Sequence, residues 1–155
     1  MNSDITTPRV DLSAVRVSQS ATILVLLAAF ALDAWPLVAI LAVINLVGAL
    51  VPALSLWRQL YVRALVPMGL VKPQVIPDHP EPHRFAQGVG AALATISAVL
   101  LAGGLQVAGW TAAWVLILLA ALNVFVGFCL GCFTYYQLNR LGVPGFRHGH
   151  LEEGS

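Results

Sequence analysis

Charged residues are scarce in this chain. Asp, Glu, Lys and Arg together make up 10% of its 155 residues, whereas hydrophobic residues make up 59%. A soluble domain of this size cannot bury so much apolar surface, so the composition predicts an integral membrane protein whose main partner is the lipid bilayer. The formal net charge of +1 gives no reason to expect nucleic-acid binding.

Acidic side chains are also missing from the membrane-crossing parts of the apolar segments, since Asp33 falls in a predicted turn. Proton-coupled pumps use ionisable groups within the membrane, so this absence argues against that class. The sequence has no Ser/His/Asp arrangement and no glycine-rich phosphate loop, which argues against common hydrolases and nucleotide-binding enzymes. We expect no cofactor, and these patterns leave open whether the protein is an enzyme.

Four apolar segments are long enough, or nearly so, to cross about 30 Å of hydrocarbon, which takes roughly 20 helical residues. Tight turns are predicted at Asp33–Pro36 and Gly109–Thr111, with Pro36 in the first turn of the helix that follows. The predicted fold is an all-α integral membrane protein, a four-transmembrane-helix bundle made of two hairpins. Its helices cover residues 15–34, 35–54, 85–108 and 110–138.

The connection between the two hairpins has two parts. Apolar residues recur at helical spacing over 55–66, which predicts an amphipathic helix at the cytoplasmic membrane interface. Five prolines then exclude a regular helix, so 67–84 is predicted to be an extended Pro-rich loop. The expected organisation is a cytoplasmic N-terminal segment (1–13), a transmembrane domain (14–140) and a cytoplasmic tail (141–155).

The basic residues predict the orientation. All eight lie outside the two predicted turns. By the positive-inside rule, both termini and the connection between the hairpins then face the cytoplasm. Trp35 and Trp110 come to lie at the outer interface, where tryptophan is enriched.

The two hairpins resemble each other in sequence. Arg16-Val17-Ser18-Gln19 opens the first predicted helix, and Arg84-Phe85-Ala86-Gln87 opens the third. Asn45 in the second helix and Asn123 in the fourth follow similar Leu/Ala-rich runs. The matches predict a parallel repeat about an axis normal to the membrane. Each asparagine needs a partner at this depth, and it either joins helices or lines a polar path.

Cysteine is rare as well, since Cys129 and Cys132 are the only two in the chain. A separation of three residues within the predicted fourth helix places both sulfurs on one face, near its cytoplasmic end. The cytoplasm is reducing, so a permanent structural disulfide is not expected. The spacing therefore favours a thiol pair that reacts at the inner edge of the membrane.

A reactive thiol needs nearby positive charge, because only the thiolate is nucleophilic. Arg16 and Arg84 lie at the same predicted depth as the thiols, and Gln19 and Gln87 would add amide hydrogen bonds. The alternative is structural: cysteine packs as a small apolar residue, the arginines anchor at the interface, and the glycines around the cysteines allow close helix packing.

A zinc site is the other chemistry that these spacings allow. Cys129 and Cys132 lie on the same predicted side of the membrane as His79 and His83, whose spacing also suits zinc. Prolines next to both histidines leave their geometry undefined, however. We therefore predict no metal site.

Several motifs together resemble a known family. The run Arg84–Gln87 after a Pro-rich loop, the run Gly127–Cys132 and the tyrosines that follow are similar to a bacterial four-helix membrane family known only as a domain of unknown function. Pro8–Asp11 and Arg16 resemble its N-terminal pattern, and the similarity covers residues 8–140. His79 and His83 are not part of the family pattern.

The resemblance implies a location in the bacterial inner membrane. Genes of this family often lie near those of thioredoxin-like and rhodanese-like sulfurtransferase proteins. The resemblance therefore also implies a role in thiol or sulfur chemistry, with such a protein as a partner.

Three functions are compatible with these observations. The first is a thiol or sulfur-handling protein, in which one cysteine attacks or accepts sulfur and the other resolves the intermediate. The second is a permease or channel for a small solute, including sulfur compounds, which would need at least a homodimer because four helices enclose little volume. The third is a non-catalytic anchor that docks a thioredoxin-like or sulfurtransferase partner on residues 55–66 and the Pro-rich loop.

Overall fold

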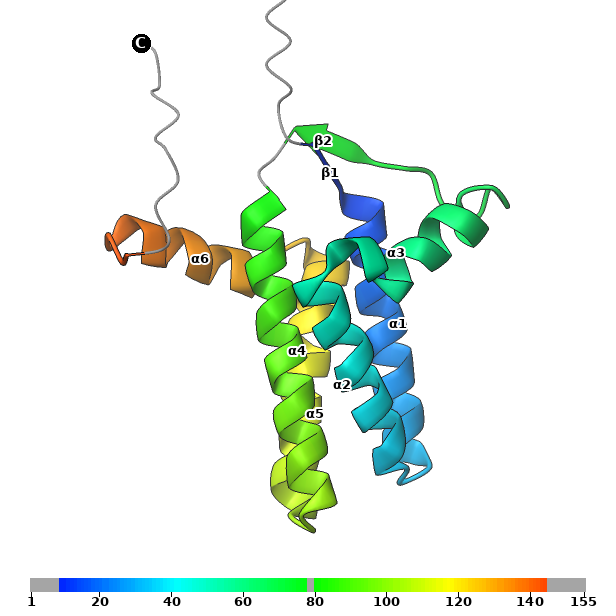
Figure 1. Ribbon diagram of the computed structural model, residues 1–155, viewed down its shortest axis with the longest axis vertical. Coiled ribbons are helices and arrows are strands. Elements are labelled where there is room, and N and C mark those ends of the chain that lie inside the picture. Colours follow the sequence, from blue (N-terminus) through cyan, green and yellow to red (C-terminus); the bar gives the residue numbers. More distant parts are fainter. Residues whose placement is uncertain (1–8, 78–79, 145–155) are drawn as a thin grey trace, which may run out of the picture.

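The computed structural model describes residues 9–77 and 80–144 (Figure 1). Four helices run alongside one another as two hairpins, and each helix packs against two others in the ring α1–α2–α4–α5. Helix α1 is therefore diagonal to α4, and α2 is diagonal to α5. The four helices are α1 (Leu12–Ala31), α2 (Trp35–Leu50), α4 (Pro80–Ala102) and α5 (Gln106–Ala121).

Three stretches of this bundle are long and apolar enough to cross a membrane: Leu12–Ala31, Glu81–Ala102 and Gln106–Val126. The last includes a π-helical turn, η3 (Leu122–Val126), that continues α5. Large apolar side chains remain exposed on the outside of the helices, as with Phe125 at 83% exposure. Such a surface suits lipid better than water, so the bundle is compatible with a membrane protein.

The first hairpin turn is confirmed. Helix α1 ends at Ala31, Asp33 adopts a positive φ of 48°, and α2 begins at Trp35 with a proline in its first turn. The second predicted turn, Gly109–Thr111, is wrong. Helix α4 ends at Ala102 and the chain reverses at Gly104, whose φ is 82°.

Gly109 instead lies inside α5, where it allows the two helices of the second hairpin to touch. A Cβ at this position would lie 2.5 Å from Cγ of Leu101 and 3.0 Å from its backbone nitrogen. Leu101 is buried, and Oγ of Ser97 donates a 2.8 Å hydrogen bond to the Gly109 carbonyl. The apolar core of the bundle includes this contact between α4 and α5. It consists mainly of Leu26, Ala29, Val38, Leu41, Ala94, Ala98, Leu101, Ala113 and Ile117.

We predict that Gly109→Ala destabilises the bundle by about 1 to 3 kcal/mol, because the added methyl group overpacks a buried contact. The matched control is Gly88→Ala in helix α4, where an added Cβ meets nothing within 4 Å. Denaturant unfolding of the detergent-solubilised protein measures both. Equal stability of the two variants would contradict the packing described here.

The connection between the hairpins is helical where predicted and then extended. Turn η1 (Pro52–Leu54) leads into α3 (Leu56–Leu60) and the π-helical η2 (Tyr61–Leu65). Strand β2 (Val75–Pro77) then pairs antiparallel with β1 (Arg9–Asp11). The prediction that the Pro-rich loop continues to residue 84 is wrong, because α4 begins at Pro80 and helices tolerate proline in the first turn.

Asp11 ties the start of the chain to this connection. Its carboxylate caps α1 by accepting from the Ser13 backbone N–H at 3.0 Å. It also accepts from the Gln74 backbone N–H at 3.2 Å and from the Tyr61 hydroxyl at 2.8 Å. The β-strand pairing was not predicted, and the first helix begins at Leu12, three residues before the predicted start at residue 15.

The predicted continuous helix over 110–138 is also wrong. Gly127 adopts a left-handed conformation with φ 73°, and a separate helix, α6 (Leu130–Arg140), begins three residues later. Helix α6 runs sideways from the end of the bundle instead of continuing along it (Figure 1). The cysteines are therefore at the start of a new helix and not on one face of a membrane-crossing helix.

Candidate functional site

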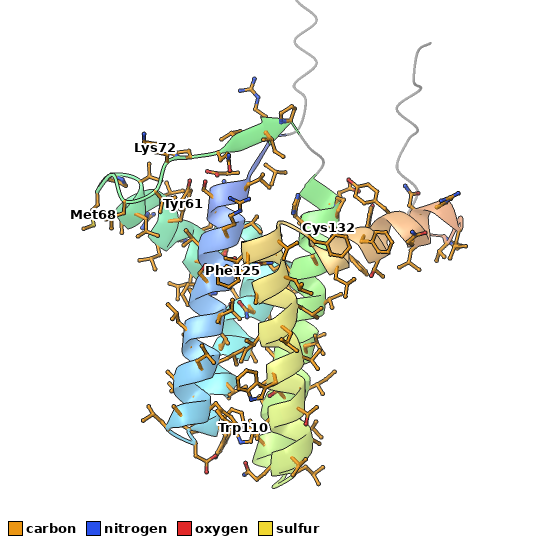
Figure 2. The ribbon with its side chains drawn as sticks, turned by 180° about the vertical axis from the view of Figure 1, so that it is seen from behind. Tyr61, Met68, Lys72, Trp110, Phe125 and Cys132 are labelled. Atoms are coloured by element: carbon orange, nitrogen blue, oxygen red, sulfur yellow. The ribbon has the colours of Figure 1, made fainter. Side chains whose placement is uncertain are left out.

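A cavity of about 170 Å³ lies between the four bundle helices. It occupies the half of the bundle near Cys132, and Trp110 lies at the opposite end (Figure 2). The cavity ends where the apolar core begins. Its polar and sulfur-bearing lining residues are Ser18, Gln19, Thr22, Asn45, His83, Arg84, Gln87, Asn123 and Cys129.

Most of the polar residues predicted from the sequence meet in this cavity. Gln19 and Asn45 come from the first hairpin, and Gln87 and Asn123 come from the second. The diagonal arrangement of α1 and α4 brings the two glutamines toward a common centre. These four amides therefore lie around one space, although they are up to 104 positions apart in the chain.

The amides have different partners. Asn45 is buried and accepts a 3.1 Å hydrogen bond from Nε1 of Trp57, which ties α2 to α3. The Gln87 amide lies against α2, since a Cβ on Gly48 would be 3.0 Å from its Nε2 atom. Oε1 of Gln19 is buried and has no hydrogen-bond partner among the described residues. A buried acceptor of this kind calls for a donor from water or a ligand.

Arg84 and Arg16 have different surroundings, although the sequence placed them equivalently. Arg84 is at the mouth of the cavity, where it is exposed to solvent and still contributes to the lining. Arg16 is exposed on α1 and is not among the described residues that line the cavity. The predicted pocket with two arginines therefore contains one of them.

Cys129 is the N-cap residue of α6. Gly127 ends the preceding π-helical turn, and Cys129 itself is extended, with φ −89° and ψ 102°. Its Sγ accepts a 3.2 Å hydrogen bond from the backbone N–H of Cys132. The unpaired N–H groups at a helix start stabilise negative charge, so this position favours a thiolate.

These surroundings lower the pKa of the Cys129 thiol from its usual 9.0 to about 6. The largest cause is a hydrogen bond from the Cys132 side chain, and burial opposes it. The backbone N–H groups of Cys132 and Gly131 and the charge of His83 lower the pKa further. The charge acting on this thiol thus comes from His83, where the sequence had suggested Arg16 and Arg84.

Cys132 lies behind Cys129, against helix α4. It is buried, and its Sγ lies 3.7 Å from Nδ1 of His83. The arrangement thus provides one thiol that faces the cavity and a second that contacts an imidazole ring.

Helix α6 is held on α4 by contacts that surround the second cysteine. The Tyr135 hydroxyl donates a 3.1 Å hydrogen bond to Oε2 of Glu81, and its ring lies 5.7 Å from the Phe85 ring. Burial and the Glu81 contact raise the pKa of Tyr135. Gly131 passes so close to Ala86 that an added Cβ would lie 2.7 Å from the alanine Cβ.

His83 is the site residue that sequence analysis missed. The family pattern does not include it, and the prolines that precede it, Pro80 and Pro82, obscured the helix start on which it lies. The sequence could have indicated its role, because His83 directly precedes Arg84 and lies one helical turn before Gln87. His79, its counterpart in the zinc hypothesis, lies outside the described residues. Within those residues, no group of three or more His, Cys, Asp or Glu side chains is placed to hold a metal.

The chain matches a known protein family. The family described as "Domain of unknown function (DUF4395)" matches residues 10–140, which include every residue of the cavity and both cysteines. No curated protein and no solved structure matches the chain.

Proposed function

Because this chain belongs to the DUF4395 family, whose description assigns no activity, we propose its function from the site: it is a membrane-embedded thiol protein that exchanges disulfides or relays sulfur. Cys129 is the attacking thiolate and Cys132 is the resolving thiol. The observation that carries this proposal is the position of Cys129, which caps a helix, lines a polar cavity and is hydrogen-bonded by its partner cysteine.

Disulfide exchange at this pair proceeds in two displacements. The Cys129 thiolate attacks one sulfur of a substrate disulfide, forms a mixed disulfide and releases the other half as a thiolate. Cys132 then attacks the Cys129 sulfur and gives its proton to the departing second half, which leaves as a thiol. The protein dithiol is thereby oxidised by two electrons, and the substrate disulfide is reduced to two thiols. A dithiol protein of the thioredoxin class would reduce Cys129–Cys132 again.

The closed floor of the cavity favours this chemistry over permeation. Beyond Asn45 and Thr22 the space is filled by buried residues such as Leu26 and Leu41, so the polar lining ends inside the bundle. A solute that enters at the cysteine end meets a dead end. This supports a binding pocket that serves the thiols, and a pathway across the bundle would need these residues to separate.

We place the protein in the bacterial inner membrane with α2 as its fourth span. Helix α2 has 16 residues, about 24 Å at 1.5 Å per residue, which is short of about 30 Å of hydrocarbon. It nevertheless packs inside the same ring as the longer helices and exposes apolar side chains such as Ile40 and Val43. The exposed Leu56 and Leu60 suit an α3 that lies in the membrane interface.

This placement puts the thiols on the cytoplasmic side. Strands β1 and β2 and helix α6 are all at one end of the bundle (Figure 1). Arg9 lies in β1, Arg140 ends α6, and Lys72 lies at the same end (Figure 2). The two hairpin turns are at the other end. The positive-inside rule then assigns the cysteine end to the cytoplasm.

The division of roles between the thiols predicts different products in two variants. With dithiodipyridine as the probe, Cys132→Ser should retain a thiopyridyl group on Cys129, because no resolving thiol remains. Cys129→Ser should react at least about tenfold more slowly at pH 7, because it lacks the activated thiolate. The wild type should release two thiopyridones and end as an internal disulfide. Mass spectrometry of the intact protein identifies each product.

Two results would contradict the assignment. The first is a Cys129→Ser protein that reacts as fast as Cys132→Ser. The second is a wild-type protein that keeps a thiopyridyl group on each cysteine, which would show that the two thiols do not reach each other.

A further inference from the structure

We propose that the cavity binds a small oxyanion carrying a transferable sulfur, of the thiosulfate class, and presents that sulfur to Cys129. This inference rests on the proposed thiol function and specifies its substrate. It is carried by the size of the cavity, the charges at its mouth, the amides around it and its closed floor.

The size of the cavity limits the ligand. Its volume of about 170 Å³ is close to that of engineered protein cavities of roughly 150 Å³ that hold one benzene molecule. A ligand on the order of six non-hydrogen atoms therefore fits. A peptide disulfide is far larger and would reach Cys129 only from the mouth. Filling the cavity itself requires a small molecule.

The charge of the lining selects an anion. Arg84 and His83 contribute to the lining at the same end as Cys129, and none of the described lining residues is acidic. A dianion placed beside a thiolate would be repelled unless positive charge lies close to both. The guanidinium of Arg84 offers a planar set of donors that suits oxyanions. His83, which lies within electrostatic range of Cys129, adds to this field.

The remaining polar groups are neutral and can bind the oxygens of such an anion. Four amides from the two hairpins line the space, and Oε1 of Gln19 has no partner among the described residues. Rotation about the broad terminal torsion of a glutamine exchanges its oxygen and nitrogen, so Gln19 can present N–H donors instead. In that rotated position the Gln19 amide would donate an N–H to an oxygen of the anion.

The reaction at Cys129 balances without any further reagent. The Cys129 thiolate attacks the outer sulfur of thiosulfate, the sulfur–sulfur bond of thiosulfate breaks, and its electron pair leaves with sulfite. The products are a persulfide anion on Cys129 and sulfite, and the total charge is unchanged. Because buried core residues lie beyond the polar lining, we expect sulfite to leave at the cysteine end of the bundle, where thiosulfate enters.

The experiment uses thiosulfate with the reduced full-length chain in lipid nanodiscs. Intact-protein mass spectrometry should show one added sulfur on Cys132→Ser, which lacks the resolving thiol, and none on Cys129→Ser. Cys132→Ser should release an equivalent amount of sulfite. Arg84→Gln should raise the half-saturating thiosulfate concentration at least about tenfold, the order expected for removing one charge-assisted contact. Arg84→Lys should recover part of the loss.

Arg16→Gln is the matched control, because Arg16 occupies the equivalent sequence position in the first hairpin but does not line the cavity among the described residues. It should bind thiosulfate like the wild type. If Arg16→Gln and Arg84→Gln raise the half-saturating thiosulfate concentration equally, the assigned site is wrong. Such a result would reflect only the net positive charge of the protein. If Cys132→Ser gains no sulfur from thiosulfate but still reacts with dithiodipyridine, the inference fails and the thiol function stands. If neither reagent reacts, the thiol function itself is wrong.

Discussion

Alkylation of Cys129 by iodoacetamide will follow a pH profile with its midpoint near 6, about three units below that of an ordinary cysteine. The lowered pKa, which results first from the Cys132 side-chain hydrogen bond, means that the thiolate is present above pH 6 and is lost as the pH falls through this value. At pH 7 about 90% of Cys129 is then ionised, against about 1% for a thiol with a pKa of 9. Quantitative mass spectrometry of the labelled peptide measures the rate at each pH.

Two variants test the causes of this shift. Cys132→Ala removes the largest stabilising contact, and His83→Gln removes the neighbouring charge, so each should move the midpoint upward. The larger move is expected for Cys132→Ala. Arg16→Gln is the control and should leave the profile unchanged, because Arg16 does not line the cavity among the described residues. A wild-type midpoint near 9 would refute the activated thiolate.

Gly131→Ala will separate the first turn of α6 from α4. The added Cβ would lie 2.7 Å from Cβ and 2.8 Å from Cα of Ala86, and a backbone atom cannot be moved aside like a flexible side chain. The displaced helix takes Cys132 away from His83. We expect a loss of about 1 to 3 kcal/mol in unfolding free energy and an upward shift in the midpoint of Cys129 alkylation.

The controls for this substitution come from the same helix pair. Gly88→Ala adds a methyl group to α4 in open space and should affect neither stability nor alkylation adversely. Ala86→Gly in the Gly131→Ala background removes one of the two clashing atoms and should restore part of both properties. If Gly131→Ala behaves like Gly88→Ala, α6 does not pack on α4 as described.

The helical bundle could be predicted because it depends on the amino-acid composition of long segments. Apolar runs of nearly 20 residues and the clustering of basic residues outside the turns do not depend on where each helix ends. The positions at which the helices end depend on single glycines, and these positions were predicted less accurately. Gly109 was taken as a turn but serves a close helix contact, while Gly104, whose φ is 82°, makes the turn. Glycine has both uses, and only the surrounding packing decides between them.

The polar half of the site was predictable for a similar reason. Gln19, Gln87, Asn45 and Asn123 interrupt apolar helices, and buried amides must find partners or a polar space. All four line the cavity. The equivalence of the two arginines did not hold: both are exposed, but of the two only Arg84 is among the described residues that line the cavity.

The placement of the cysteines was not predictable from spacing alone. The run through Gly127 is mostly apolar and contains no proline, and cysteine is not among the residues that usually cap helices, so the sequence suggested one uninterrupted helix. The left-handed conformation of Gly127 ends that helix and makes Cys129 a cap. The contribution of His83 also depends on this break, because the new helix brings Cys132 against α4.

The central claim is that Cys129 is an ionised thiol open to water at the cytoplasmic end of the bundle. The most direct measurement compares labelling by a charged, membrane-impermeant maleimide in inside-out and right-side-out vesicles at pH 7. Cys129 should be labelled rapidly in inside-out vesicles, ahead of the buried Cys132, and should be protected in right-side-out vesicles. If Cys129 reacts in neither preparation until the protein is denatured, it is a buried packing residue and the proposed function is wrong.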